Sequence, residues 1–201
     1  GGKVYEHNDV SVGFVAKVKF EDYSEEYLAV EHLKREYNLY DVSDKLNKTV
    51  ENLRKNNKNA TDKTADSLAK LPAPIFDIVM KIIKFMDNHD LLPETITKNS
   101  LYHSSIIVSN LGSFKSSSIY HNLTDFGTAS SLITMGAIHK EPVINDNGEV
   151  EVKDICDFGI NLDERIGDGY YFVKSMKMFE YIIMHPEVLE EQLGDQLTID
   201  E

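Results

Sequence analysis

The sequence predicts a mixed α+β fold in which one sheet is covered by helices. Residues 10–20 alternate apolar and polar side chains with period two, which indicates a half-buried strand. Residues 42–55 and 71–88 instead repeat their apolar positions with a helical period. Strands and helices follow one another without a regular βαβ rhythm, so the sheet is not expected to be all parallel. A chain of 201 residues suits a single domain spanning residues 1–201.

The first strand is expected to bury one apolar face. That face carries Val10, Val12, Phe14, Ala16, Val18 and Phe20. A strand this complete so near the start suggests that elements in front of it are missing, so we expect the domain to be incomplete at its N-terminus. Residues 27–33 form a weaker candidate for a second strand.

Three helices are expected in the first half of the chain. The helix over residues 42–55 has one apolar stripe, and a short helix through residues 65–69 follows it. The third runs over residues 71–88, with Pro72 and Pro74 in the first turn, where proline is tolerated. Phe76, Met80 and Phe85 widen its apolar face. We therefore expect this helix to be buried on more than one side or to meet a partner.

The second half of the chain predicts three strands and a final helix. The strands are expected at residues 104–111, 131–138 and 149–162, with turn chemistry in residues 145–148. Asp168 is expected to cap the last helix, and Pro186 ends or kinks it. Cys156 is interpreted as a packed strand residue.

Composition excludes several classes of function. A net charge of −13 repels phosphate backbones and argues against nucleic acid as a partner. A single cysteine excludes an internal disulfide and a multi-cysteine zinc site. Residues 71–86 are too polar to span a membrane, and no signal peptide is visible, so the cytoplasm is the expected location.

Two motifs carry the functional prediction. The first is Ser109-Asn110-Leu111-Gly112, and the second is Asp163-Glu164-Arg165-Ile166-Gly167-Asp168-Gly169. In this order they resemble the 2-oxoacid dehydrogenase acyltransferase family, the dihydrolipoamide acyltransferases with the chloramphenicol acetyltransferase fold. That family reads Asp-His-Arg-x-x-Asp-Gly, so Glu164 stands where the family has its catalytic histidine. The resemblance implies a chloramphenicol acetyltransferase-like sheet and a homotrimer or higher homo-oligomer.

The resemblance also implies roles for individual residues. Ser109 matches the serine whose hydroxyl holds the oxyanion, and Glu164 takes the place of the general base, across a subunit boundary in the family's trimer. Asp168 completes the catalytic set. Arg165, Asn110 and Gly169 are expected to be structural at the site, with Arg165 as an ion-pair partner that fixes its turn.

Each of the two reactive positions has an alternative. Ser109 can be a strand-end serine satisfied by its own backbone. Glu164 can be a base if burial raises its proton affinity, a carboxylate paired with Arg165 or another cation, or a polar group that binds a cationic ligand. An ordinary glutamate, with a pKa near 4.3, accepts a thiol proton poorly compared with histidine near 6.5.

The other histidines are not expected to replace the missing base. His103, His121 and His139 are interpreted as surface or packed residues, and none shows the spacing of a metal site. No metal and no covalently bound cofactor are expected.

Two functions therefore remain open. The first is acyl transfer between a coenzyme A thioester and a thiol or other acceptor, with weak or altered activity because of Glu164. The second is a non-catalytic relative that binds or assembles. No lipoyl-bearing segment occurs in these residues, which makes membership of a dehydrogenase complex doubtful.

Overall fold

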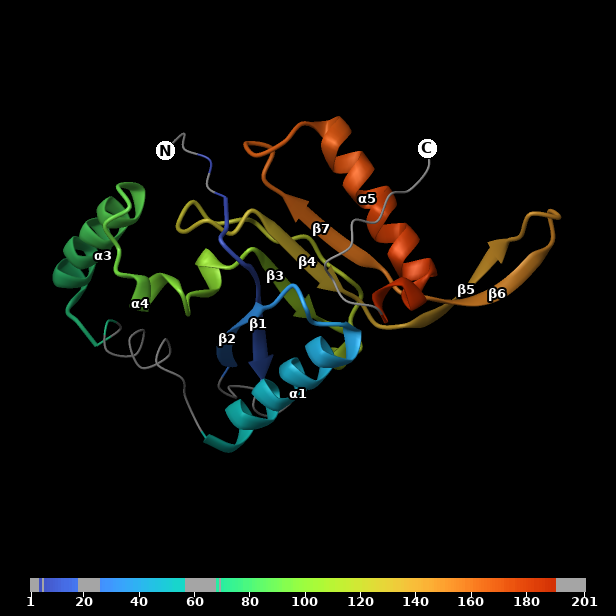
Figure 1. Cartoon of the computed structure of the whole chain (residues 1–201), viewed down its shortest axis with the longest axis horizontal. Helices are drawn as coiled ribbons and strands as arrows, with labels where there is room; N and C mark the ends of the chain where they lie inside the picture. The colour runs from blue at the N-terminus through green and yellow to red at the C-terminus, as the bar shows by residue number, and fades with distance from the viewer. Residues whose placement is uncertain (1–3, 5, 18–25, 57–67, 69, 191–201) are drawn as a thin grey trace.

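A computed structural model describes residues 4, 6–17, 26–56, 68 and 70–190. Its centre is a five-stranded mixed sheet in the order β2-β1-β3-β4-β7 (Figure 1). The strands are β1 (Val10–Lys17), β2 (Glu26–Leu33), β3 (Ile106–Asn110), β4 (Ser131–Met135) and β7 (Phe158–Leu162). The pairs β1–β3 and β3–β4 are parallel, whereas β1–β2 and β4–β7 are antiparallel. The predicted α+β class is confirmed.

Two helices cover the same face of this sheet. Helix α1 (Leu39–Asn56) lies against β2, where Thr49 donates a hydrogen bond to Glu31 and Lys45 forms an ion pair with it. Helix α5 (Gly169–Met184) lies along β7, and Phe179 meets Phe158 edge to face. Paired residues of a sheet point to the same side, and the register places Glu31 and Phe158 on one face. The opposite face is therefore left for other segments.

The opposite face is closed by the turn η1 (Leu101–His103) and the residue that follows it. A side chain at Gly13 would stand 2.6 Å from the Ser104 hydroxyl, so the turn sits directly on β1. Leu101 joins Ile107, Ala129 and Leu132 in the buried apolar cluster. The face of the fold that lacks α-helices thus holds this core cluster.

The first strand is most deeply buried at Ser11 and Gly13, whereas Val12 and Phe14 of the predicted apolar face are only partly buried. Ser11 is only 2% exposed, whereas Val10 is 58% exposed. The reason is a pairing 94 residues away, since Ser11 and Ser105 bond to each other through their backbone N–H groups and hydroxyls. Val18 and Phe20 of the predicted strand lie outside the described residues.

The predicted strand over residues 149–162 is wrong, because it divides between two sheets. Its first part is β6 (Val150–Ile155), which pairs only with β5 (His139–Ile144) in a separate hairpin. Gly136 N–H donates to the Asp157 carbonyl at 2.9 Å, and this bond turns the chain from the hairpin into β7. Cys156 lies in this break, with Sγ 3.4 Å from the Gly136 carbonyl, so it is not the predicted strand residue. The hairpin projects away from the body (Figure 1).

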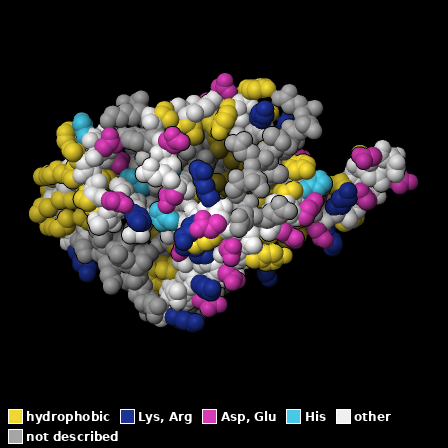
Figure 2. Space-filling view, viewed as in Figure 1, with side chains coloured by type: hydrophobic (Ala, Val, Ile, Leu, Met, Phe, Trp, Pro, Cys, Tyr) yellow, Lys and Arg dark blue, Asp and Glu magenta, His cyan; other side chains and the backbone are white. Residues whose placement is uncertain are grey.

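Helix α3 (Ala73–Asn88) stands at the other end of the molecule, followed by the short α4 (Glu94–Thr97). Of the two expectations for α3, burial on more than one side within the chain is wrong, since none of its residues is classed as buried in the described structure, and contact with a partner stays a prediction. Its exposed stripe, which we call the α3 stripe, consists of Ile75, Ile78, Ile82 and Phe85, each 49–59% exposed. Hydrophobic side chains gather over this helix at the left of Figure 2. The short helix predicted at residues 65–69 falls almost wholly outside the described residues.

One buried carboxylate fastens α3 to the body. Asp87 accepts a hydrogen bond from the Gly127 N–H at 2.9 Å and binds His103 Nε2 at 2.9 Å. Both side chains of the Asp87–His103 pair are less than a tenth exposed. His103 is therefore a packed structural residue, as predicted. Among the described residues, no helix is both long and apolar enough to cross a membrane.

The capping of α5 follows the sequence prediction. The Asp168 carboxylate accepts a hydrogen bond from the Tyr171 N–H at 2.9 Å, which satisfies one of the free amides in the first turn. The helix ends at Met184, and the turn η3 (Pro186–Leu189) follows, so Pro186 lies just past the helix end.

Asp168→Ala is expected to lower the free energy of unfolding by about 1 kcal/mol, because the cap is lost. Urea unfolding followed by circular dichroism measures the change. Asp168→Asn is the matched control and should keep most of the stability, since asparagine caps as well as aspartate. Equal stability of the alanine variant and the wild type would contradict the capping role.

Candidate active site

Ser109 lies near the end of the central strand β3. The register places it opposite Thr134 of β4, which in turn pairs with Gly159 of β7. Ser109 lines a pocket on the sheet face that lacks α-helices. Its hydroxyl makes no hydrogen bond to any residue in the described part of the chain, so the alternative of a serine satisfied by its own backbone is not observed. This hydroxyl is free to donate to a ligand.

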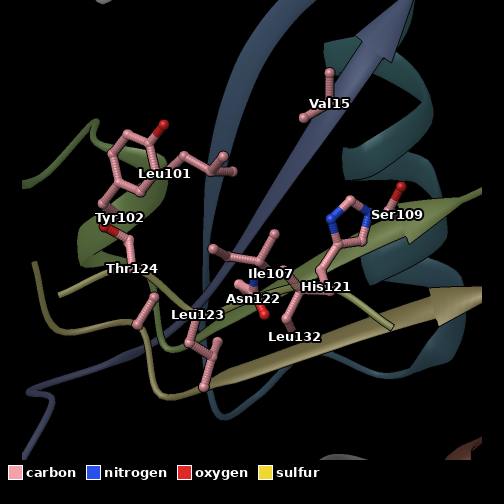
Figure 3. Close-up of a pocket in the computed structure, with 11 residues that line it drawn as sticks. Val15, Leu101, Tyr102, Ile107, Ser109, His121, Asn122, Leu123, Thr124 and Leu132 are labelled. Atoms are coloured by element: carbon pink, nitrogen blue, oxygen red, sulfur yellow. The ribbon is translucent and has the colours of Figure 1, made fainter. Parts of the chain in front are cut away.

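The pocket is an apolar hollow of about 210 Å³. Figure 3 shows side chains from β1, η1, β3, β4 and the loop before β4 converging on it. Its apolar walls are Val15, Leu101, Ile107, Leu123, Ala129 and Leu132. The polar side chains on its lining are Tyr102, Ser109, His121, Asn122 and Thr124. An apolar cavity with a few polar groups is the usual form of a small-molecule site.

A buried hydroxyl holds the pocket's loop onto the sheet. Thr134 is fully buried and donates to the Ile119 carbonyl at 2.5 Å, while the Ile119 N–H donates back to it at 3.2 Å. A side chain at Gly159 would stand 2.4 Å from the same carbonyl. The loop can approach the sheet this closely only because position 159 has no side chain.

His121 follows two residues after this clamp. Its N–H donates to the Asn161 side-chain carbonyl of β7 at 3.0 Å, and its side chain is exposed and lines the pocket. Neither ring nitrogen is bonded to a residue that the structure describes. The sequence correctly places His121 in a loop, but its position in the same pocket as Ser109 was missed. No local pattern in the sequence could have revealed it, because contacts with β4 and β7 create the placement.

The residues that follow Ser109 in the motif form the turn at the end of β3. Asn110 accepts a hydrogen bond from the Ser113 N–H at 3.3 Å and shapes the turn η2 (Gly112–Phe114). A side chain at Gly112 would meet the Gly136 carbonyl at 2.8 Å. These residues end β3 sharply beside Ser109, which agrees with the structural role expected for Asn110.

The second motif forms an exposed turn between β7 and α5. Arg165 donates through Nε and Nη2 to both oxygens of Asp163, at 2.5–2.9 Å. This fork lowers the pKa of the Asp163 carboxyl and raises that of the Arg165 guanidinium. Arg165 is thus the ion-pair partner that the sequence predicts, and its partner is Asp163. A side chain at Gly169 would meet no atom within 4 Å, so this subunit does not itself require glycine there.

Glu164 is exposed at the tip of this turn. It makes no ion pair or hydrogen bond within the described ranges, so the expected pairing with Arg165 is wrong. Burial by its own subunit, which would favour a carboxylate as a base, is also not observed.

Glu164 and Ser109 lie toward opposite ends of the sheet in one subunit. Ser109 shares a row with Gly159, and Glu164 is five residues further along the β7 direction. From Gly159 to the end of β7 at Leu162 the distance along the strand is ~10 Å at about 3.3 Å per residue, and Glu164 lies in the turn beyond that end. The two motifs therefore do not form one site within a subunit. In the described ranges, no three His, Cys, Asp or Glu side chains come together as a metal site needs.

The sequence profile of the 2-oxoacid dehydrogenases acyltransferase (catalytic domain) matches residues 88–190, just over half of the chain. The chain belongs to this family. The matched segment contains Ser109, His121 and the whole motif from Asp163 to Gly169. No curated protein matches the sequence significantly.

Solved acyltransferase structures share the fold. The probable dihydrolipoamide acetyltransferase of Listeria monocytogenes 4b F2365 matches 99% of this chain with 14% identity and a TM-score of 0.58. The cubic core of a pyruvate dehydrogenase multienzyme complex matches 91% with 10% identity and a TM-score of 0.56. The dihydrolipoamide acetyltransferase of Azotobacter vinelandii, solved to examine a serine, a histidine and an asparagine in its catalytic mechanism, matches 92% with 12% identity and a TM-score of 0.56.

These matches settle the fold class as chloramphenicol acetyltransferase-like. At 10–14% identity they carry the fold and not the chemistry. The chain covers 63% of the Listeria chain and 57% of each of the other two, so it spans about three fifths of their length.

Proposed function

We propose that this protein transfers an acyl group from a coenzyme A thioester to a thiol or other acceptor. The observation that carries the proposal is the Ser109 hydroxyl, which lies on the wall of an apolar pocket and bonds to no residue that the structure describes. The other buried hydroxyls of this sheet face are occupied, since Ser11 bonds to Ser105, Ser104 to the Leu101 carbonyl, and Thr134 to Ile119. In a member of an acyltransferase family, a free hydroxyl at this position can serve as a hydrogen-bond donor to the ligand.

The chemistry needs such a donor. When the acceptor attacks the thioester carbonyl, the carbonyl oxygen becomes an oxyanion, and a hydrogen bond from Ser109 Oγ stabilises it. The C–S bond then breaks, the acyl group stays on the acceptor, and the coenzyme leaves as its thiol. No covalently bound cofactor is needed for these steps.

The pocket suits a small acyl group. Its volume of about 210 Å³ lies below the ~300–1,000 Å³ of sites that enclose drug-sized ligands. The apolar walls favour an uncharged chain, so the charged parts of the coenzyme would remain outside. A net charge of −13 means that few cations are available to hold those parts.

Glu164 lowers activity toward thiol acceptors in this proposal. It stands at the position of the family's histidine, and an exposed carboxylate is a poor acceptor for a thiol proton. The same observation favours a second candidate, a non-catalytic protein that binds an acyl thioester without transferring it.

We propose in addition that the protein is a homotrimer. In one subunit Glu164 and Ser109 lie toward opposite ends of the sheet, and a neighbouring copy can bring them together. The α3 stripe has spacings of three, four and three residues, which is the pattern of a helix-packing seam. The projecting hairpin also exposes Ile144, Val150 and Val152, each by 65–75%. Exposed apolar surface of this extent is typical of an interaction site.

Ser109→Ala is expected to lower kcat for acetyl transfer by about 10²–10³-fold, because one oxyanion donor is lost. The assay follows transfer from isotopically labelled acetyl-CoA to dihydrolipoamide. Ser43→Ala on the exposed side of α1 is the control and should leave the rate unchanged. An active Ser109→Ala variant would remove the main support for the proposed function.

The trimer is expected in light scattering on the chain at micromolar concentration, as a mass of three chains. Ile78→Asp should shift this mass downward, because it places a charge in the α3 stripe. Asp77→Ala, on the neighbouring and already polar position, should not. A concentration-independent monomer for the wild type would contradict the proposal.

Glu164→His is expected to raise acetyl transfer to dihydrolipoamide, on the order of 10²-fold, if it restores a general base. Glu164→Gln, which has a similar size and no basic group, should bring no such gain. If the wild type is already efficient and Glu164→Gln abolishes transfer, glutamate is the base. If neither wild type nor Glu164→His transfers while acetyl-CoA still binds, the binding protein is the correct function.

A further inference from the structure

We propose that His121, from the same subunit as Ser109, accepts the acceptor's proton during acyl transfer. The inference rests on the proposed function and deepens it, because it assigns a second group to the same pocket. It also supplies a proton acceptor in addition to position 164, where the exposed carboxylate of Glu164 is a poor one.

The two side chains line the same pocket. Ser109 comes from β3 and His121 from the loop before β4, and both line the same hollow. Figure 3 shows the His121 imidazole and the Ser109 hydroxyl at one end of the pocket, with Leu101 and Tyr102 at the other. A thioester whose carbonyl reaches Ser109 would therefore present its reacting carbon near the imidazole.

The loop that carries His121 is held in place although it has no regular secondary structure. The Thr134 hydroxyl pins Ile119 through both its N–H and its carbonyl, and Asn161 accepts from the His121 N–H itself. Three hydrogen bonds within three residues fix the backbone against β4 and β7. A base must stand at a defined place relative to the bond that reacts, and these contacts supply that placement.

The imidazole is also free to react. The rings of His103 and His32 are engaged at both nitrogens, the former by Ser100 and Asp87 and the latter by Asp9 and the Lys98 carbonyl. Those two rings are structural parts of the fold. The His121 ring has no such partner among the described residues, so one nitrogen can accept a proton while the other keeps its own.

The proton and bond balance is complete with these two groups. The acceptor's S–H, O–H or N–H loses its proton to a ring nitrogen of His121 as its heteroatom bonds to the thioester carbon. Ser109 Oγ–H donates to the resulting oxyanion. As the tetrahedral species collapses, the C–S bond breaks, and the imidazolium returns the proton to the departing coenzyme sulfur. No oxidant, metal or further reactant is required.

The test compares His121→Ala with the wild type in labelled acetyl-CoA to dihydrolipoamide transfer. His121→Ala is expected to lower kcat by about 10²-fold or more while KM for acetyl-CoA stays within about twofold, since a general base typically contributes 10²–10⁴-fold. Added imidazole should restore part of the lost rate, because the free base can enter the space that the side chain leaves. His139→Ala is the control, since His139 is exposed on the hairpin and lines no part of the pocket, and imidazole should not alter its rate.

The outcomes separate this inference from the proposed function. Transfer by wild type that persists in His121→Ala overturns the role of His121 and leaves acyl transfer standing. A loss that imidazole does not restore, accompanied by a lower melting temperature, assigns His121 to the fold instead. A wild type that transfers nothing overturns both. Loss of kcat with unchanged folding and rescue by imidazole supports His121 as the proton acceptor.

Discussion

The hydroxyl of Thr134 is the contact on which the pocket depends. It is fully buried in the middle of the sheet, in register with Ser109 on one side and Gly159 on the other. From there it serves both the N–H and the carbonyl of Ile119, so a loop that lacks regular structure acquires a fixed height above the strands. The bare backbone of Gly159 provides the room for this approach. Without the hydrogen bonds between Thr134 and Ile119, the loop would not be held over the apolar pocket, and Ser109 would face solvent.

Local patterns predict the parts of this fold that depend on local interactions. The helical periods over residues 42–55 and 71–88 correspond to α1 and α3, and Asp168 caps α5 as its position before Gly169 indicates. Two errors in the sheet have one cause, which is a partner distant in the sequence. The bond between Gly136 and Asp157 divides the strand predicted at residues 149–162, and the pairing of Ser11 with Ser105 buries the polar side of β1. The position of His121 in the pocket was not predicted for the same reason. Ser109 was predicted as a site residue because it lies in a family motif.

Much of the apolar surface in the described part of this chain is exposed. The α3 stripe and the projecting hairpin remain exposed, while the described core is a small cluster around Leu101 and Ile107. Yet α3 is not loosely attached, since Asp87 binds His103 on η1 and the Gly127 N–H in one buried junction. Because the C-terminal end of α3 is fixed by these bonds, the apolar stripe is held in an outward-facing position. The same molecule therefore combines a pocket made from its own residues with exposed apolar surfaces on α3 and the hairpin.

The exposure of Glu164 has a consequence for how this branch of the family can diverge. The side chain is exposed, makes no hydrogen bond or ion pair within the described residues, and is not part of the pocket lining, so exchanging it for another residue is expected to carry little penalty in stability. Most mutations are limited because they lower stability toward the threshold that folding requires. A substitution at position 164 is largely free of this limit. A lineage can exchange the residue there without first acquiring compensating changes in its core. The shape of the pocket around Ser109 can persist through such a substitution, because Glu164 is not part of its lining.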